Sequence, residues 1–234
     1  MHLTPILSGA NSCLLCGASS PSKLALCTPC QAELPSIESA CLRCALSLGP
    51  TPPSQRLCGQ CSANAPPFEH CYPPGHYAFP LRALIARLKF HGRLRIGNAL
   101  GHLLALRLAP VFSAVPPDAL LPVPLHTGRL RRRGFNQSIE IAQQLSHHLH
   151  IPIAPGYCER VLASKPQRGL RATERKKNVQ GVFRLVPEAM QNTPCHIVIV
   201  DDVVTTMATV QAIAYLLKEE GVERVDVACL ARVS

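Results

Sequence analysis

Residues 197–210, with the sequence IVIVDDVVTTMATV, indicate the fold more strongly than any other segment. The first four residues form a continuous β-branched run, which is typical of a strand buried on both faces of a parallel sheet. The run ends in Asp201 and Asp202, and a Thr-rich stretch then leads to a helical pattern over 209–220 that Gly221 closes. This order predicts an α/β protein with a ligand at the carboxyl end of the strand, where open parallel sheets bind their ligands.

Similar elements recur along the rest of the chain. Apolar residues at helical spacing predict helices over 81–88 and 100–104, and Asn136 is suited to cap a third helix. The apolar runs 119–124 (ALLPVP) and 225–230 predict two more buried strands. Helices alternating with continuous apolar strands predict a Rossmann-like parallel sheet.

Each part of the opening segment has a use in binding a sugar phosphate. Asp201 and Asp202 can accept hydrogen bonds from the two vicinal hydroxyls of a ribose. Thr205, Thr206 and Thr209 offer hydroxyl donors, and the loop N–H groups and the helix dipole favour a phosphate. We therefore expect a ribose 5-phosphate here; the alternative is a strand that ends in a polar turn without a ligand.

The first 61 residues contain four Cys-x-x-Cys pairs, Cys13/Cys16, Cys27/Cys30, Cys41/Cys44 and Cys58/Cys61. Two such pairs complete a tetrahedral four-cysteine Zn²⁺ site. We expect two structural sites made by sequential pairs; alternating pairs, nested pairs, or one occupied site beside a degenerate one are the alternatives. A disulfide framework is the rival interpretation, but it requires an oxidising compartment, and the chain shows no export signal. No ligand position looks open for a catalytic water, so we expect a structural or docking role.

The remaining cysteines and a histidine cluster receive no functional role. Cys195 and Cys229 lie in strand-like apolar runs and are expected to be small core residues. His147, His148 and His150 are expected to lie on a solvated helix face rather than to bind a metal.

Composition limits the partners. Apolar residues make up 47% of the chain, which supports a real core, and the net charge of +10 favours phosphates, nucleic acid or acidic lipid. The positive charge is concentrated, because residues 82–134 hold ten Lys and Arg and one acidic residue. No apolar run is long enough to span a bilayer, and the N-terminus does not resemble a signal peptide, so a cytoplasmic protein is expected.

The proline content suggests a domain boundary. Residues 62–76 read SANAPPFEHCYPPGH and have no helical period. We expect a double zinc ribbon over 1–65, a Pro-rich linker over 66–77 and an α/β domain over 78–234.

Four motifs together resemble one family. IVIVDDVVTTMAT (197–209) is similar to the phosphoribosyl pyrophosphate (PRPP) loop of type I phosphoribosyltransferases. LKFHGR (88–93), PVPLHTGRLRRRGFNQS (122–138) and QRGLRATERKKNVQGVF (167–183) resemble, in order and spacing, the ComF family of ComFC- and GntX-like proteins, which are linked to DNA uptake and competence. Members of that family begin with a similar zinc ribbon, and the resemblance spans nearly the whole chain.

The resemblance implies a type I phosphoribosyltransferase domain, the fold of a class of glycosyltransferases, that binds PRPP with Mg²⁺. It implies that Asp201 and Asp202 bind the ribose hydroxyls. The residues implied to bind the 5-phosphate are Thr205, Thr206, Met207, Ala208 and Thr209.

The resemblance also implies where pyrophosphate binds and leaves. The loop after 119–124, with Arg129, Arg133 and Gly134, resembles the pyrophosphate loop, and the basic stretch 165–178 resembles the flexible hood. In such enzymes Mg²⁺ and cations stabilise the departing charge while closure excludes water. The catalytic candidates in the hood are Arg168, Arg171, Arg175 and Lys176.

One residue departs from the family pattern. Met207 stands where the family normally has Gly, which permits a positive φ or a close approach of the backbone to phosphate. If φ is positive here, we expect a strained or narrowed loop and weaker PRPP binding.

Three functions follow from these features. The first is a phosphoribosyltransferase with an unknown acceptor. The second is a single-stranded-DNA-binding accessory factor of DNA uptake that uses the same fold as a binding module, with Arg131–Arg133 on the DNA backbone. The third, suggested by family analogy, is a zinc-ribbon protein that docks on a helicase-like competence protein.

Overall fold

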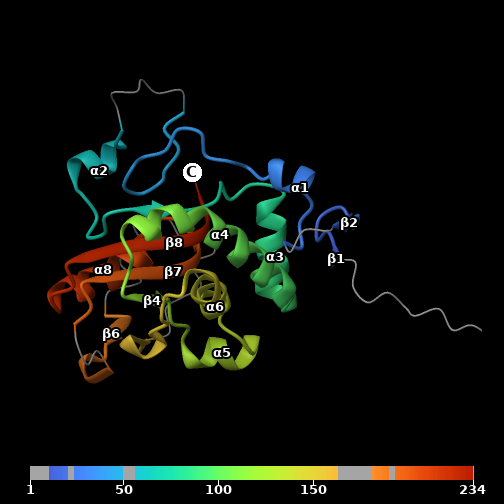
Figure 1. Cartoon of the computed structure of the whole chain (residues 1–234). Helices are drawn as coiled ribbons and strands as arrows, with labels where there is room; N and C mark the ends of the chain where they lie inside the picture. The colour runs from blue at the N-terminus through green and yellow to red at the C-terminus, as the bar shows by residue number, and fades with distance from the viewer. Residues whose placement is uncertain (1–10, 21–23, 50–55, 163–180, 190–192, 234) are drawn as a thin grey trace, which may run out of the picture.

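A four-stranded parallel sheet forms the centre of the molecule in the computed structural model, which describes residues 11–20, 24–49, 56–162, 181–189 and 193–233 (Figure 1). The strand order is β3-β8-β7-β4, and each neighbouring pair is parallel. Their bounds are β3 Cys71–Tyr72, β4 Ala119–Pro122, β7 His196–Val204 and β8 Arg224–Arg232. The predicted strands 119–124, 197–200 and 225–230 are therefore present, and β7 and β8 both extend beyond the predicted runs.

Helices cover both faces of this sheet. They are α3 Leu81–His91, α4 Leu94–Ala114, α6 Gln137–Leu149 and α8 Ala208–Glu219, whereas α5 Thr127–Arg133 has no buried residue and is exposed. Alternate residues of β7 point to opposite faces, so Val198 joins a buried cluster with α3, α4 and α6, whereas Ile199 joins a second cluster with α8. Burial on both faces explains why these strands are continuously apolar. Asn136 caps α6 as expected, because its side chain accepts a hydrogen bond from the Ser138 N–H.

Short elements complete the described chain. In the N-terminal part they are β1 Asn11–Ser12, β2 Ser19–Ser20, α1 Thr28–Ala32 and α2 Gly59–Ala63. The others are β5 Cys158–Arg160, paired with β6 Phe183–Leu185, and the 3₁₀ turns η1 Pro155–Tyr157 and η2 Pro187–Ala189. Figure 1 shows α1 and α2 well apart, with residues 34–49, which follow α1, running along one edge of the sheet.

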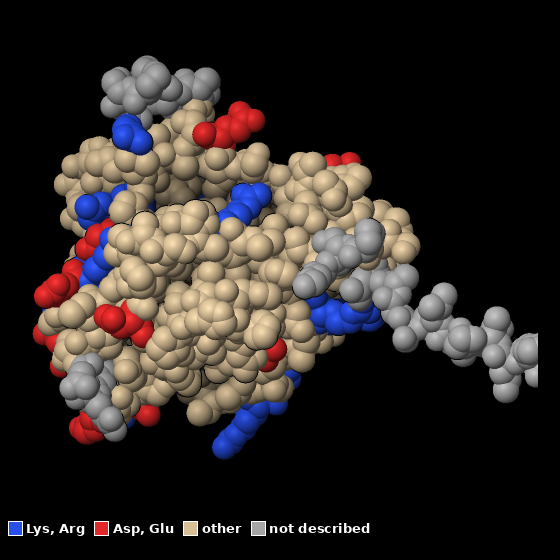
Figure 2. Space-filling model, viewed as in Figure 1, with Lys and Arg blue, Asp and Glu red and all other residues tan. Residues whose placement is uncertain are grey.

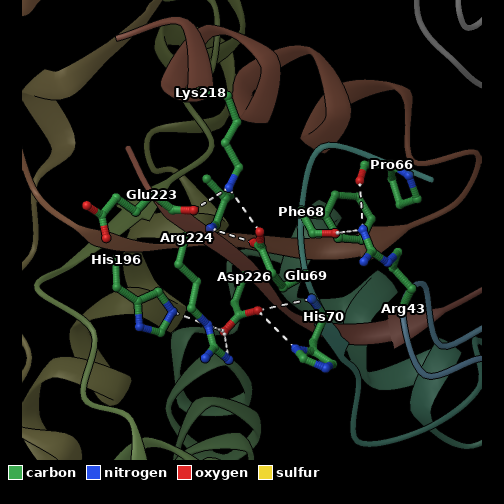
Figure 3. Close-up of polar contacts among 11 residues, drawn as sticks. Arg43, Pro66, Phe68, Glu69, His70, His196, Lys218, Glu223, Arg224 and Asp226 are labelled. Carbon is green, nitrogen blue, oxygen red and sulfur yellow. Dashed lines mark hydrogen bonds and ion pairs between the residues drawn. The ribbon is translucent and has the colours of Figure 1, made fainter. Parts of the chain in front are cut away.

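The stretch 66–77, expected to be a linker, is part of the α/β unit. It contains β3, the edge strand of the sheet, and Phe68 is fully buried in the second cluster. Glu69 accepts hydrogen bonds from the Lys218 Nζ at 2.9 Å and the Val225 N–H at 2.8 Å (Figure 3). The prolines interrupt regular structure here, but the intervening side chains bind this segment to the sheet.

Asp226 joins three parts of the sheet at its amino ends. Its carboxylate is fully buried and accepts hydrogen bonds from the His70 N–H at 3.0 Å and Arg224 Nε at 3.0 Å (Figure 3). His196 Nε2 lies 3.0 Å from Oδ2, the same carboxylate oxygen that accepts the Arg224 hydrogen bond. Since these partners come from the segment before β3, from β7 and from β8, one carboxylate fixes the relative position of all three.

Candidate functional site

The cysteine pairs form two separate four-cysteine sets, as sequential pairing predicts. Within each set the four Sγ atoms lie within 4.8 Å of one another. The sets are Cys13, Cys16, Cys27 and Cys30, and Cys41, Cys44, Cys58 and Cys61. Four converging thiols are the donor set of a structural Zn²⁺ site, so both sets fit the metal.

Electrostatics of the second set explain why it requires a cation. Burial alone raises the pKa of Cys41, but N–H groups of Cys44, Cys58 and Arg43 outweigh it and lower that pKa to about 7. Burial raises the pKa of Cys44 to about 11, and the charge on Cys41 contributes to this. The protein alone therefore favours one thiolate but opposes a second, and Zn²⁺ supplies the charge that lets all four thiols ionise.

A cavity of about 730 Å³ lies at the carboxyl ends of β4 and β7. Its walls include Asp201 and Asp202 from β7, the loop that follows β7, and Arg129 and Arg133 from α5. Its position matches the general rule for ligand sites in open parallel sheets. The structure thus brings together, in one concave surface, two groups of residues that the sequence suggested from separate motifs.

The two carboxylates have different environments. Asp202 Oδ2 lies 2.9 Å from Lys89 Nζ and accepts a hydrogen bond of 2.9 Å from Gln137 Nε2. Asp201 Oδ1 accepts the Asp202 N–H at 2.8 Å and the Ser138 hydroxyl at 3.4 Å. Burial, followed by repulsion from Asp202, raises the pKa of Asp201 to about 7. One carboxylate is therefore paired with a cation, while the other is protonated in part of the molecules near neutral pH.

The loop after β7 leads directly into a helix N-terminus. Residues 205–207, here called the β7–α8 loop, line the cavity together with Ala208 and Thr209. Met207 is the N-cap of α8, and its side chain makes no capping hydrogen bond. N–H groups in the first turn of a helix favour an anion, so this end of the cavity suits a phosphate.

Cationic side chains of α5 also line the cavity. The segment expected to be a pyrophosphate loop is the helix α5, which Gly134 ends with a φ of 83°. Arg129 and Arg133 line the cavity, whereas Gly134 does not border it. Burial lowers the pKa of Arg133, which shows that its guanidinium is partly withdrawn from water.

Comparison with known proteins gives the family. The family model described as "Double zinc ribbon domain" matches residues 9–65. Competence protein F of Haemophilus influenzae is 35% identical over 214 residues, which cover 90% of this chain and 92% of that protein. The chain belongs to the competence protein F family. Two further members are DNA utilization protein YhgH of Escherichia coli K12, 38% identical over 88% of this chain and 90% of that protein, and competence protein ComFC of Bacillus subtilis, 30% identical over 60% and 55%.

Several cavity residues of this family member were not predicted from its sequence. Lys89 and Phe90 come from the LKFHGR motif, Gln137 and Ser138 follow α5, and Arg160 lies on β5. The motifs 88–93 and 122–138 were recognised, but no role was assigned to these positions. The Gln137 side chain is buried; its Nε2 donates to Asp202, and its Oε1 has no hydrogen-bond partner among the described residues.

Other predictions for this family member have different outcomes. Arg168, Arg171, Arg175 and Lys176 lie outside the described residues. Cys229 is fully buried as expected, but the expectation of a buried Cys195 is wrong: this residue precedes β7 and is exposed. None of the helices formed by described residues is long and apolar enough to cross a membrane.

Met207 has the positive φ that the family's glycine would provide. Its φ is 65°, and the residue is only 4% exposed within the second buried cluster. A left-handed backbone costs a non-glycine residue about 1–2 kcal/mol, whereas the buried side chain contributes more than that to stability. Met207 therefore offsets a backbone cost by packing in the core.

The first test replaces this residue. Met207→Gly is expected to reduce the free energy of unfolding by about 2 kcal/mol, because the loss of a buried side chain exceeds the relief of backbone strain. For the PRPP binding that is proposed below, the same change is expected to tighten affinity a few-fold, because glycine lets the loop backbone approach a phosphate closely. Urea denaturation and calorimetry measure the two effects. Met207→Ala is the control, since it loses the same packing but keeps a Cβ; PRPP binding that is unchanged or weaker in Met207→Gly would contradict this account.

Proposed function

We propose that this chain binds Mg·PRPP in the cavity beside β7, as a phosphoribosyltransferase-fold protein of DNA uptake or utilisation. The observation that carries the proposal is the convergence of an Asp pair, a phosphate-suited loop and two arginines on one cavity. PRPP carries the groups that these features suit, namely vicinal ribose hydroxyls, a 5-phosphate and a pyrophosphate.

The Asp pair suits the ribose. Asp201 and Asp202 are consecutive residues at the end of a rigid, buried strand, and Lys89 and Gln137 hold Asp202 from two different helices. A carboxylate with both its partners fixed loses little entropy when it accepts a hydroxyl hydrogen bond. The β7–α8 loop and the first turn of α8 would then hold the 5-phosphate next to it.

The arginines that line the cavity suit the pyrophosphate. Arg129 and Arg133 line the wall of the cavity that α5 provides, and Arg160 adds a third guanidinium. Mg²⁺ prefers oxygen ligands and binds through one or two carboxylates plus phosphate oxygens, so the Asp201 carboxylate at the cavity wall fits its chemistry. When bound, Mg²⁺ would neutralise charge on the leaving pyrophosphate. The hood residues Arg168, Arg171, Arg175 and Lys176 are proposed to add cations over the reacting centre.

The names of the relatives support the biological setting. Competence protein F and DNA utilization protein YhgH are similar to this chain over about nine-tenths of their length. A direct role with DNA is the second candidate function. It is favoured by α5, on which Arg131 and Arg132 are exposed, and Figure 2 shows basic side chains projecting from the edge of the molecule where Figure 1 places this helix.

The two functions are separated by a binding assay. Equilibrium dialysis of the zinc-loaded chain with PRPP, ribose 5-phosphate and inorganic pyrophosphate should show tightest retention of PRPP, because only PRPP fills all three parts of the cavity. A single-stranded oligonucleotide is tested in parallel at increasing salt. Strong, steeply salt-dependent DNA binding without retention of PRPP would favour the second function and reject the first.

The raised pKa of Asp201 predicts how PRPP binding depends on pH. The ionised carboxylate of Asp201 accepts hydrogen bonds from the ribose hydroxyls, so the form that binds ligand is lost as the pH falls below the pKa of about 7. PRPP affinity is therefore expected to fall about tenfold for each pH unit below that value and to level off above it. Calorimetry across this range measures the effect. Asp201→Asn should flatten the profile, and an equally steep profile in that variant would show that Asp201 is not the group involved.

A further inference from the structure

Arg232, near the end of β8, connects two parts of the molecule that the sequence treats as separate. The residue is 4% exposed, and its Nε donates to the Cys44 carbonyl at 2.9 Å. Its Nη1 lies in hydrogen-bond contact with the carbonyls of Val204, at 3.2 Å, and Thr205. In the part of the chain that the structure describes, Arg232 forms no ion pair, and its side-chain hydrogen bonds all end on backbone carbonyls, including that of Val233 at 2.6 Å.

The two ends of this bridge have different functions. Cys44 is a member of the second four-cysteine set, and its carbonyl belongs to the turn that brings Cys41 and Cys44 together. Val204 ends β7, and Thr205 begins the β7–α8 loop that lines the cavity. A single planar guanidinium with a fixed fork of donors therefore spans the distance from the metal-binding turn to the candidate phosphate site.

Packing reinforces this connection. Cys41, Cys44, Cys58 and Cys61 belong to the same buried cluster as Val204 and Met207, so the second ribbon and the β7–α8 loop share a core. The first ribbon is different: Cys13 and Cys30 belong to the other cluster, with α3 and α4. Its described side-chain link to the α/β unit is the hydrogen bond from Arg87 on α3 to the Leu14 carbonyl, at 3.3 Å, and no hydrogen bond among described residues joins it to the loop.

We propose that Arg232 is a positioning residue that couples the second zinc ribbon to the β7–α8 loop, so that metal at Cys41, Cys44, Cys58 and Cys61 controls the phosphate affinity of the cavity. With the metal bound, the turn at Cys44 is fixed, and Arg232 holds Val204 and Thr205 in the arrangement that directs loop N–H groups to an anion. Without it, the Cys44 carbonyl has no fixed position, and the guanidinium loses one of its anchors. In the described part of the chain, the first ribbon packs against α3 and not against the β7–α8 loop, so it is not expected to act on that loop through Arg232.

Hydrogen exchange tests this coupling without any ligand. Cys61→Ser and Cys30→Ser are a matched pair, because each removes the last ligand of one set and leaves three thiols. In the full zinc-loaded chain, Cys61→Ser is expected to raise the exchange rates of the amides of residues 205–209 by about tenfold or more, and Cys30→Ser to leave them within about twofold. Equal effects of both variants, or none at these amides, would overturn the proposal.

Substitution of the guanidinium tests the residue itself. Arg232→Gln is expected to give the same faster exchange at 205–209 with both zinc ions retained, as measured by metal analysis. Arg87→Gln is the control, since Arg87 also donates to a ribbon backbone carbonyl, that of Leu14 at 3.3 Å, but in the first ribbon. If Arg232→Gln left the exchange unchanged while keeping its zinc, Arg232 would not be the coupling residue.

A binding measurement then connects the coupling to the proposed function, on which this part rests. With PRPP as the probe, Arg232→Gln is expected to weaken binding about tenfold, the scale of one lost hydrogen bond to a charged group. By linkage, saturating PRPP should tighten the equilibrium affinity for the second zinc and not for the first, as measured by competition with a chelator. If the wild type does not bind PRPP, the proposed function fails, while the exchange experiments still decide the coupling. Normal PRPP affinity in Arg232→Gln would overturn the proposal that Arg232 controls the phosphate affinity of the cavity.

Discussion

Removal of zinc from the full chain is expected to lower its melting temperature by roughly 10 °C or more, because structural zinc contributes several kcal/mol of folding free energy. Loss of zinc is expected to destabilise the α/β unit as well as residues 11–65. Cys30, Leu26 and Leu34 of the first ribbon lie in the cluster under α3 and α4, and Cys44 and Cys61 of the second lie in the cluster under α8. Loss of either metal therefore exposes surface in the core of the α/β unit.

Calorimetric melting with and without a strong chelator measures this effect, and added zinc should restore the original transition. Cys195→Ser is the matched control, because Cys195 is an exposed cysteine outside both sets and its loss should leave zinc content and melting unchanged. A melting temperature that the chelator leaves unaltered, with the zinc shown to be gone, would contradict the structural role of the metal.

Asp226→Ala is expected to destabilise the chain by about 3–5 kcal/mol, the cost of removing one partner from a buried charge network. The change would leave His196 and Arg224 facing an empty, fully buried position, and it would remove the acceptor of the His70 N–H. Asp226→Asn keeps the shape and part of the hydrogen bonding, so a smaller loss is expected. Urea denaturation measures both variants; a loss below about 1 kcal/mol for Asp226→Ala would contradict the role assigned to this residue.

The same carboxylate predicts a dependence of stability on pH. Burial alone raises the pKa of Asp226, but the hydrogen bond from His196 and the charge of Arg224 outweigh it, so its pKa lies below the ordinary value. An acid whose pKa is lowered by folding stabilises the protein fully above its unfolded pKa of about 4, and this contribution is lost as the pH falls through the lower folded value. The wild type should therefore lose stability more steeply below about pH 4 than Asp226→Asn does.

The sequence was most informative where local pattern and burial agree. The β-branched run 197–200 is buried on both faces, so its composition alone predicted a central parallel strand. Zinc-ligand spacing was equally direct, because Cys-x-x-Cys pairs act within a single turn and sequential pairing requires few residues between them. Residues 201–209, which are proposed to bind the ribose and the 5-phosphate, all line the cavity and are contiguous in the sequence.

Features made by distant residues were not predictable from patterns. Asp202 contacts Lys89 and Gln137, and Gln137 lies 65 positions away in the sequence. No local sequence pattern relates residues so far apart. Arg232 appears in the sequence as the end of an apolar strand, and its link to Cys44 spans 188 positions. The strand β3 was not predicted because its segment is rich in proline. A strand of two residues at the sheet edge can nevertheless have prolines as neighbours.

The helix α5 shows a different limit. Its sequence, TGRLRRR, has no apolar face, and none of its residues is buried, so the periodicity that marks a packed helix is absent. The helix is defined by its ends instead. The His126 side chain accepts the Gly128 N–H, and Gly134 closes the helix in the left-handed conformation. The result is a short, exposed helix that presents Arg129 and Arg133 to the cavity.

The central claim, that the cavity beside β7 binds Mg·PRPP, is tested most directly by calorimetric titration of the zinc-loaded chain with PRPP, with and without Mg²⁺, alongside Asp202→Asn. The account predicts binding by the wild type that requires Mg²⁺ and is weakened about a hundredfold or more in Asp202→Asn, whose amide cannot replace the carboxylate held by Lys89 and Gln137. Absence of binding by the wild type, or equal binding by Asp202→Asn, would contradict it.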